Sequence, residues 1–116
     1  MNKNANYIIN NWMKSFCNAW IEKNIDNILK LFSNNVEYWE TPTDMIGDKN
    51  RLRVLWEEIL PLENQEINYN IIETDQINNK YIIEWHFTCK GESSSGRYFI
   101  TLNNENLCTY FLQTFQ

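Results

Sequence analysis

The sequence predicts one α+β domain spanning residues 1–116, with helices in its first half and an antiparallel sheet in its second. Before Pro61 the apolar side chains recur at helical spacing, and from Glu66 onward they alternate with a period of two. A chain of 116 residues is long enough to bury a core without disulfides or metal. Helices followed by a run of strands are typical of a fold with helices on one face of the sheet.

Three helices are expected before Pro61. The first covers Tyr7–Trp20, where apolar residues occupy every fourth position: Ile8, Trp12, Phe16 and Trp20. A short second helix has Asn24 as its N-cap and ends at Ser33–Asn35. The third has Asp48 as its N-cap and stops at Pro61, because proline in a helix interior removes a hydrogen bond.

The strands are expected from alternation and from the turn residues between them. They are Val36–Thr41, a strand that begins at Glu66, Tyr81–Lys90, Arg97–Leu102 and Leu107–Phe115. Turns are expected at Asn78-Asn79 and at Asn103–Asn106, and a serine-rich loop at Gly91–Gly96.

Composition excludes several classes of function. A net charge of −5 and scattered basic residues argue against nucleic acid as a partner. No apolar run reaches 18 residues, so we expect no membrane span and a cytoplasmic location. With one histidine and three cysteines that lack C-x-x-C spacing, we expect no structural zinc, no cofactor, and cysteines that are buried apolar thiols.

Several short sequence motifs accompany this order of elements. They are Phe16-x-x-Ala19-Trp20, Asp26, the run Leu31–Tyr38, Pro42, Gly47 and Trp56. Together they resemble the nuclear-transport-factor-2-like superfamily, in particular its SnoaL-like branch, over nearly the whole chain. The resemblance implies a cystatin-like α+β roll, a cone in which a curved antiparallel sheet wraps the N-terminal helices around an apolar pocket. It also implies a homodimer through the outer sheet face, as in many members.

The superfamily includes ketosteroid isomerases, polyketide cyclases, dehydratases, epoxide hydrolases and domains of no known reaction, so the fold alone does not choose a function. Glu40 shares a strand face with Val36 and Tyr38. By resemblance to the isomerases it lies where a carboxylate moves a proton, and burial among aromatic rings would raise its pKa. Glu40 is therefore a candidate acid/base. The alternative is a strand-end glutamate turned to solvent or paired with a neighbour.

The partners of such a carboxylate differ from the isomerase pattern. Phe16 stands where the isomerases have a tyrosine, and it has no hydrogen-bond donor. Tyr98 is the nearest match to their second acid and is a candidate donor. No acidic residue of the cyclase kind occurs in Arg97–Leu102, and Arg97 lacks the two inward acids that an epoxide hydrolase needs.

Aromatic residues could line a ligand pocket. The candidates are Phe16, Trp20, Tyr38, Trp56, Trp85 and Tyr98. The alternative is that they form core, above all Trp12 and Trp20 on the first helix. His86 and Trp39 alternate away from the inner positions, so we expect both on the outside.

Three functions remain open at this point. The leading hypothesis is a SnoaL-like domain of no assigned reaction that holds a small, mostly apolar molecule. The second is a lyase, isomerase or hydrolase that uses Glu40. The third is a dimeric interaction module without a ligand.

Overall fold

The computed structural model describes residues 3–63 and 65–116. The elements are α1 (Lys3–Ile21), α2 (Ile25–Leu29), β1 (Phe32–Thr41), β2 (Asp44–Ile46), α3 (Lys49–Ile59), β3 (Gln65–Asp75), β4 (Lys80–Cys89), β5 (Glu92–Leu102) and β6 (Cys108–Phe115). Helices precede a long run of strands, as the change of apolar period predicts. The α+β class is therefore confirmed.

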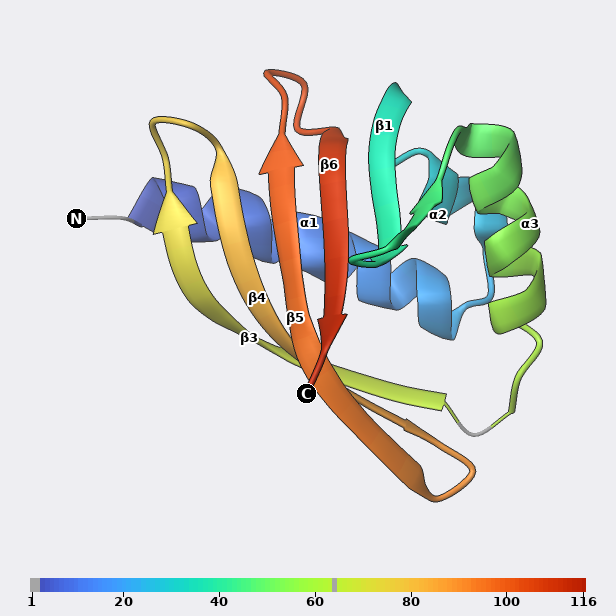
Figure 1. Cartoon of the computed structure of the whole chain (residues 1–116). Helices are drawn as coiled ribbons and strands as arrows, with labels where there is room; N and C mark the ends of the chain where they lie inside the picture. Colours follow the sequence, from blue (N-terminus) through green and yellow to red (C-terminus); the bar gives the residue numbers. More distant parts are fainter. Residues whose placement is uncertain (1–2, 64) are drawn as a thin grey trace.

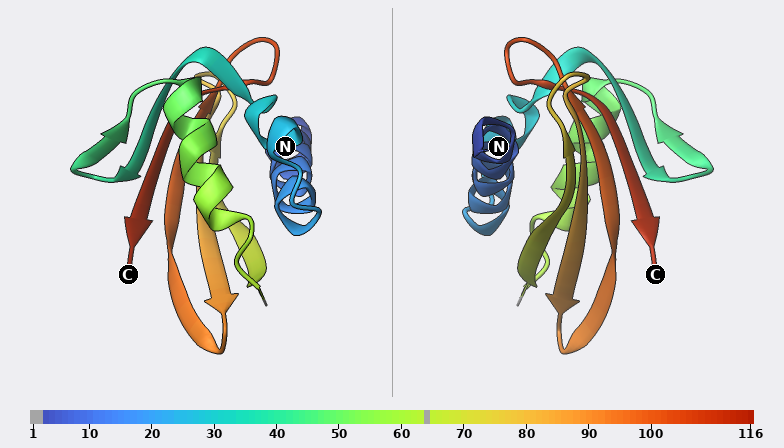
Figure 2. Two further views of the ribbon diagram at one scale, coloured as in Figure 1. Left: turned by 90° about the vertical axis from the view of Figure 1, so that its right-hand side faces the viewer. Right: turned by 90° about the vertical axis from the view of Figure 1, so that its left-hand side faces the viewer.

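The six strands form one sheet in the order β2-β1-β6-β5-β4-β3. Neighbouring strands are antiparallel except β1 and β6, which run parallel. The long strands bend around α1, which crosses one face of the sheet (Figure 1). No helix of the described chain covers the face that points away from α1 (Figure 2). This curved, unclosed sheet around the N-terminal helix is the expected roll.

The core lies between α1 and the sheet and consists largely of aromatic rings. Phe16 is fully buried at its centre, with ring centroids of Trp12, Trp56 and Tyr98 at 5.3, 5.5 and 6.1 Å. Such pairs stabilise beyond the area they bury, by about 0.5–1.5 kcal/mol each. Trp12 also donates its indole N–H to the carbonyl of Leu31 at 3.1 Å, which ties α1 to the start of β1.

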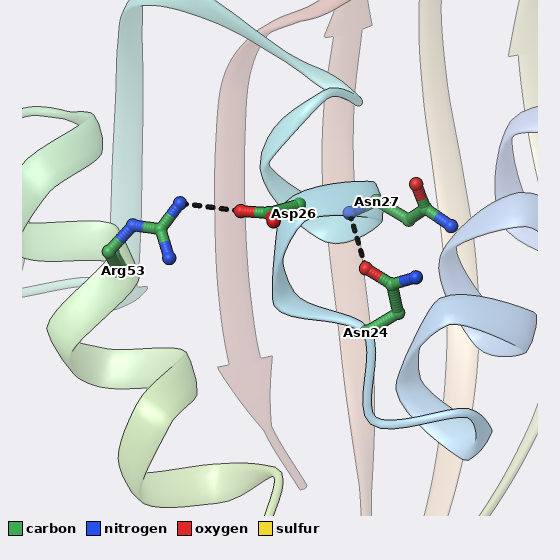
Figure 3. A network of polar contacts seen from close by, with 4 residues as sticks. All are labelled: Asn24, Asp26, Asn27 and Arg53. Atoms are coloured by element: carbon green, nitrogen blue, oxygen red, sulfur yellow. Dashed lines mark hydrogen bonds and ion pairs between the residues drawn. The ribbon is translucent and has the colours of Figure 1, made fainter.

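Capping residues begin the two later helices where the sequence predicts. The Asn24 side chain accepts from the backbone N–H of Asn27 at 3.1 Å, and Asp48 accepts from that of Arg51 at 3.0 Å. Asp26 pairs with Arg53 at 2.7 Å and so joins α2 to α3 (Figure 3). Both partners of that pair are exposed, so the link adds little stability.

The predicted end of the second helix is wrong. The helix ends at Leu29, and Phe32–Asn35, expected as helix end and loop, belong to β1. The cause is long-range: Cys108 donates its backbone N–H to Leu31 at 2.8 Å, and Phe32 pairs with Cys108 in the parallel ladder. The short strand β2 was not expected at all.

The prediction of a serine-rich loop at Gly91–Gly96 is also wrong, because all of this segment except Gly91 belongs to β5. The turn between β4 and β5 is only Lys90-Gly91, whose φ angles of 54° and 82° form a tight hairpin connection. Ser93–Ser95 then pair with His86–Thr88. Serine is a weak strand former, and pairing with β4 overrides that local preference.

Candidate functional site

A cavity of about 230 Å³ opens between α1, the end of α3 and the inner face of the sheet. Its lining residues are Trp20, Glu40, Ile59, Leu62, Trp85, Phe87, Ser94, Tyr98, Gln113 and Phe115. We call it the aromatic cup. Trp85 stacks on Tyr98 with centroids 5.8 Å apart and meets the edge of Phe115 at 5.5 Å. Half of the lining residues are aromatic, and the others are apolar or carry a single polar group.

Gly96 allows one wall of the cup to form. It lies opposite Trp85 in the β4–β5 ladder. A Cβ atom at this position would stand 2.8 Å from Cζ2 of Trp85 and would overlap the carbonyl oxygen of Thr114. Only glycine lets the Trp85 indole lie across β5 while β6 stays paired behind it.

Glu40 is the only carboxylic acid among the described residues that line the cup. Its Oε1 accepts a 2.6 Å hydrogen bond from Nε2 of Gln113, which also donates to the Glu40 backbone carbonyl at 3.2 Å. Its Oε2 is buried and has no hydrogen-bond partner among the described residues. Burial raises the pKa of Glu40, the Gln113 hydrogen bond opposes this, and nearby Asp44 adds to it. The carboxyl group is thus easier to protonate than an ordinary glutamate.

Two further polar groups belong to the cup. Burial, with smaller contributions from Cys17 and Glu40, raises the pKa of Tyr98 well above its usual range. Its phenol therefore stays protonated and can donate. The indole Nε1 of Trp85 is buried without a partner in residues 3–63 and 65–116. Unpartnered buried polar atoms are uncommon and require an explanation.

The structure brings together some of the expected site residues and separates others. Glu40, Trp20, Trp85 and Tyr98 line the cup. Three expected ligand-binding residues do not, because they fill the core: Phe16, Tyr38 and Trp56.

Sequence reasoning missed Gln113, Phe87, Phe115 and Ser94. Each lies on the inner side of its strand, and the alternation alone could have identified Phe87, which is two positions after Trp85. Ser94 was missed because its segment was predicted to be a loop and not a strand. Gln113 becomes visible only once β1 is known to pair with β6.

The outward predictions are correct. His86 is exposed and lies 3.3 Å from Glu84, its neighbour on the same face. Trp39 is half-buried and donates its indole N–H to Glu37 at 2.7 Å, outside the cup. Neither residue lines the candidate site.

The cysteines have mixed environments. Cys17 and Cys108 are buried free thiols, and burial raises the pKa of Cys17 to about 11. Cys89 is partly exposed. Across the described ranges, no three His, Cys, Asp or Glu side chains gather as metal ligands would. In the same ranges, none of the helices combines the length and apolar character needed to cross a bilayer.

A second, wider hollow of about 720 Å³ lies on the side of the sheet that faces away from α1. Its floor carries the apolar and aromatic side chains of Ile82, Phe99, Tyr110 and Leu112. Its charged lining residues are Glu73, Asp75 and Lys80. It has no part in the aromatic cup, since the sheet separates the two.

Comparison with known proteins identifies the fold. No family model matches this sequence, and no curated protein matches it either. An NTF2-like protein of unknown function from Shewanella oneidensis superposes with a TM-score of 0.78 at 11% identity, over 92% of this chain and 96% of that one. A "putative polyketide cyclase" from Xanthomonas campestris gives 0.77 at 8% identity, over 95% and 91%.

A protein of unknown function with a cystatin-like fold from Methylobium petroleophilum gives a TM-score of 0.77 at 9% identity, over 94% of this chain and 76% of that one. At such identities the likeness concerns the fold alone. The chain has the NTF2-like, cystatin-like fold that its sequence motifs resemble.

Proposed function

We propose that this NTF2-like domain binds a small, mostly apolar compound in the aromatic cup. The observation that carries the proposal is the combination of aromatic walls with two buried polar atoms, Oε2 of Glu40 and Nε1 of Trp85, that lack hydrogen-bond partners among the described residues. Ligand sites in proteins are mostly apolar cavities with a few polar groups that fix orientation. A ligand with one hydrogen-bonding group would supply the missing partner.

The volume limits the size of this compound. An apolar cavity of about 150 Å³ holds benzene. By proportion, the 230 Å³ cup suits a compound of roughly nine or ten non-hydrogen atoms. A bicyclic ketone such as indanone has that size, a flat apolar body and one acceptor, so it is a suitable probe.

A thermal-shift titration with indanone tests the proposal. A ligand present at about 100 times its Kd stabilises the native state by about 2.7 kcal/mol. We expect Ser94→Phe, which fills the cup, to abolish the shift. Ser93→Phe is the matched control, because Ser93 occupies the opposite face of β5. Equal shifts in both variants would place the probe elsewhere, and no shift in the unmodified protein would refute indanone-type binding.

A second function, proton transfer, is favoured by the position of Glu40. A buried carboxyl group whose pKa is raised gives or takes a proton at a higher pH than an exposed glutamate, and Tyr98 offers a donor for a developing oxyanion. Phe16, in the core below, supplies no donor. The test is exchange of the α-protons of indanone in D₂O, followed by NMR. Enzyme-dependent exchange that disappears in Glu40→Gln supports catalysis, and exchange equal to that of the buffer rejects it.

We also propose that the outer sheet face binds a second copy of this chain. The wide hollow combines an apolar floor with charges of both signs, Lys80 beside Glu73 and Asp75. A two-fold axis brings the same patch on both copies together, so opposite charges can pair. Light scattering should show a dimer that Phe99→Asp converts to monomer. A monomer at all concentrations would refute this proposal.

A further inference from the structure

Gln113 occupies a central position at the polar end of the aromatic cup. In the parallel ladder Trp39 pairs with Leu112, so the next residues, Glu40 and Gln113, lie level with each other. In the antiparallel ladder Gln113 pairs with Tyr98. Glu40, Gln113 and Tyr98 therefore form a row across β1, β6 and β5, and all three line the cup.

The hydrogen bonds fix the orientation of the Gln113 amide. Its Nε2 donates to the backbone carbonyl of Glu40 at 3.2 Å and to Oε1 of the same residue at 2.6 Å. A carbonyl oxygen can only accept, so the amide cannot be reversed without placing two acceptors together. Both hydrogens of Nε2 are consequently used on Glu40. Oε1 faces a donor and cannot carry the acid proton, which leaves that proton to Oε2.

We propose that Gln113 is a positioning residue that locks the Glu40 carboxyl group, with Oε1 fastened to β6 and Oε2 left for the bound molecule. The proposal rests on the proposed function, and it narrows the ligand class to neutral compounds with a hydrogen-bond acceptor. Oε2 is buried and unpartnered in the described chain, and as an acid it donates to such an acceptor.

The charges around the cup support this class. The described residues that line it include no Lys, Arg or His, so an anionic ligand would meet no counter-charge from them. The titratable groups that act on Glu40 or are acted on by it are Asp44 on β2, Tyr98 on β5 and Tyr38 on β1. The two phenols are fully buried with raised pKa values, so they stay neutral. Asp44 adds negative charge and favours the protonated form of Glu40.

Titration of the ligand-free protein tests the lock. In protein labelled with carboxyl-¹³C glutamate, Glu40 is assigned from the signal that Glu40→Gln removes. Gln113→Met keeps the size of the side chain and removes its donor, so we expect the midpoint of Glu40 to move up in pH. Gln116→Met, the same change three residues further along and away from Glu40, should leave it unmoved.

Gln113→Glu provides a second test in case Gln113→Met fails to fold. It keeps the shape of the side chain and places two carboxyl groups where one proton is shared, which should raise one midpoint strongly. Folding of every variant is checked by circular dichroism. Unchanged Glu40 midpoints in Gln113→Met and Gln113→Glu would overturn the positioning role.

Three probes of one shape test the ligand class: indanone, indane carboxylate and aminoindane. We expect indanone to bind at least about tenfold more tightly than the carboxylate, because no cationic side chain among the described lining residues balances the charge of a buried anion. Its affinity should fall as pH rises through the Glu40 midpoint, and Gln113→Met should move that fall to higher pH. Tighter binding of aminoindane, with affinity that rises with pH, would overturn the neutral class.

The two proposals fail in different ways. If none of the probes binds, the ligand-binding function and the ligand class fall together, while the ligand-free titration still decides the role of Gln113. Indanone could bind while Gln113→Met changes neither the titration midpoint of Glu40 nor the pH at which indanone affinity falls. The ligand-binding function would then stand, and the positioning role of Gln113 would be refuted.

Discussion

Replacement of Gly96 by alanine should destabilise the protein severely. The added Cβ would stand 2.8 Å from Cζ2 of Trp85 and would overlap the carbonyl of Thr114, so β5 and β6 must separate locally. Overpacking costs up to about 3 kcal/mol, and a disturbed ladder hydrogen bond adds about 1 kcal/mol. We expect a loss of about 3–4 kcal/mol, which at about 4 °C per kcal/mol lowers Tm by roughly 12–16 °C.

Gly47→Ala is the matched control. A Cβ there would meet only Arg51, with its Cδ at 3.6 Å, which is an ordinary contact. Its stability should stay within about 0.5 kcal/mol of the unmodified protein. Urea unfolding followed by tryptophan fluorescence measures both variants. If Gly96→Ala fell within about 1 kcal/mol of Gly47→Ala, the tight contact of Trp85 with β5 would be refuted.

Three further outcomes are expected. Because the folded-state pKa of Glu40 lies above its ordinary value of 4.5, its contribution to stability is complete below pH 4.5 and is lost as pH rises through the folded pKa. Glu40→Gln should therefore gain stability relative to the unmodified protein as pH rises in urea titrations, and a difference constant with pH would contradict this. Asn24→Ala removes a cap and should cost about 1 kcal/mol in the same assay, whereas no change would show that the cap is dispensable. A thiol reagent should label Cys89 in the native state and label Cys17 and Cys108 only after unfolding, so native labelling of all three would contradict the burial.

The fold could be predicted because its main signals are local. The apolar stripe of α1, the caps Asn24 and Asp48, and the alternation of β3 and β4 each lie within one element. The errors came from contacts between distant segments. Phe32 became strand because Cys108, far along the chain, pairs with it. Ser93–Ser95 became strand because β4 pairs with them against their propensity.

The candidate site was predicted in part for the same reason. Strand alternation and the resemblance placed Glu40 and Tyr98 on inner positions, and both line the cup. The sequence pattern does not distinguish Phe16 and Trp56 from the aromatic residues that line the cup, yet both fill the core. Whether an inward side chain is buried in the core or lines the cavity depends on how the sheet bends. Gln113 carries no local signal, since its role depends on the β1–β6 pairing.

The central claim is that the aromatic cup binds a small neutral compound beside Glu40. The most direct test is a ¹H–¹⁵N spectrum of the five tryptophan indole N–H groups during titration with indanone. The indole N–H of Trp85, which has no hydrogen-bond partner among the described residues, should shift strongly because the ligand changes its surroundings. The indole of Trp12, bonded to Leu31 in the core, should stay in place. A Trp85 signal that does not move at saturating indanone would contradict the claim.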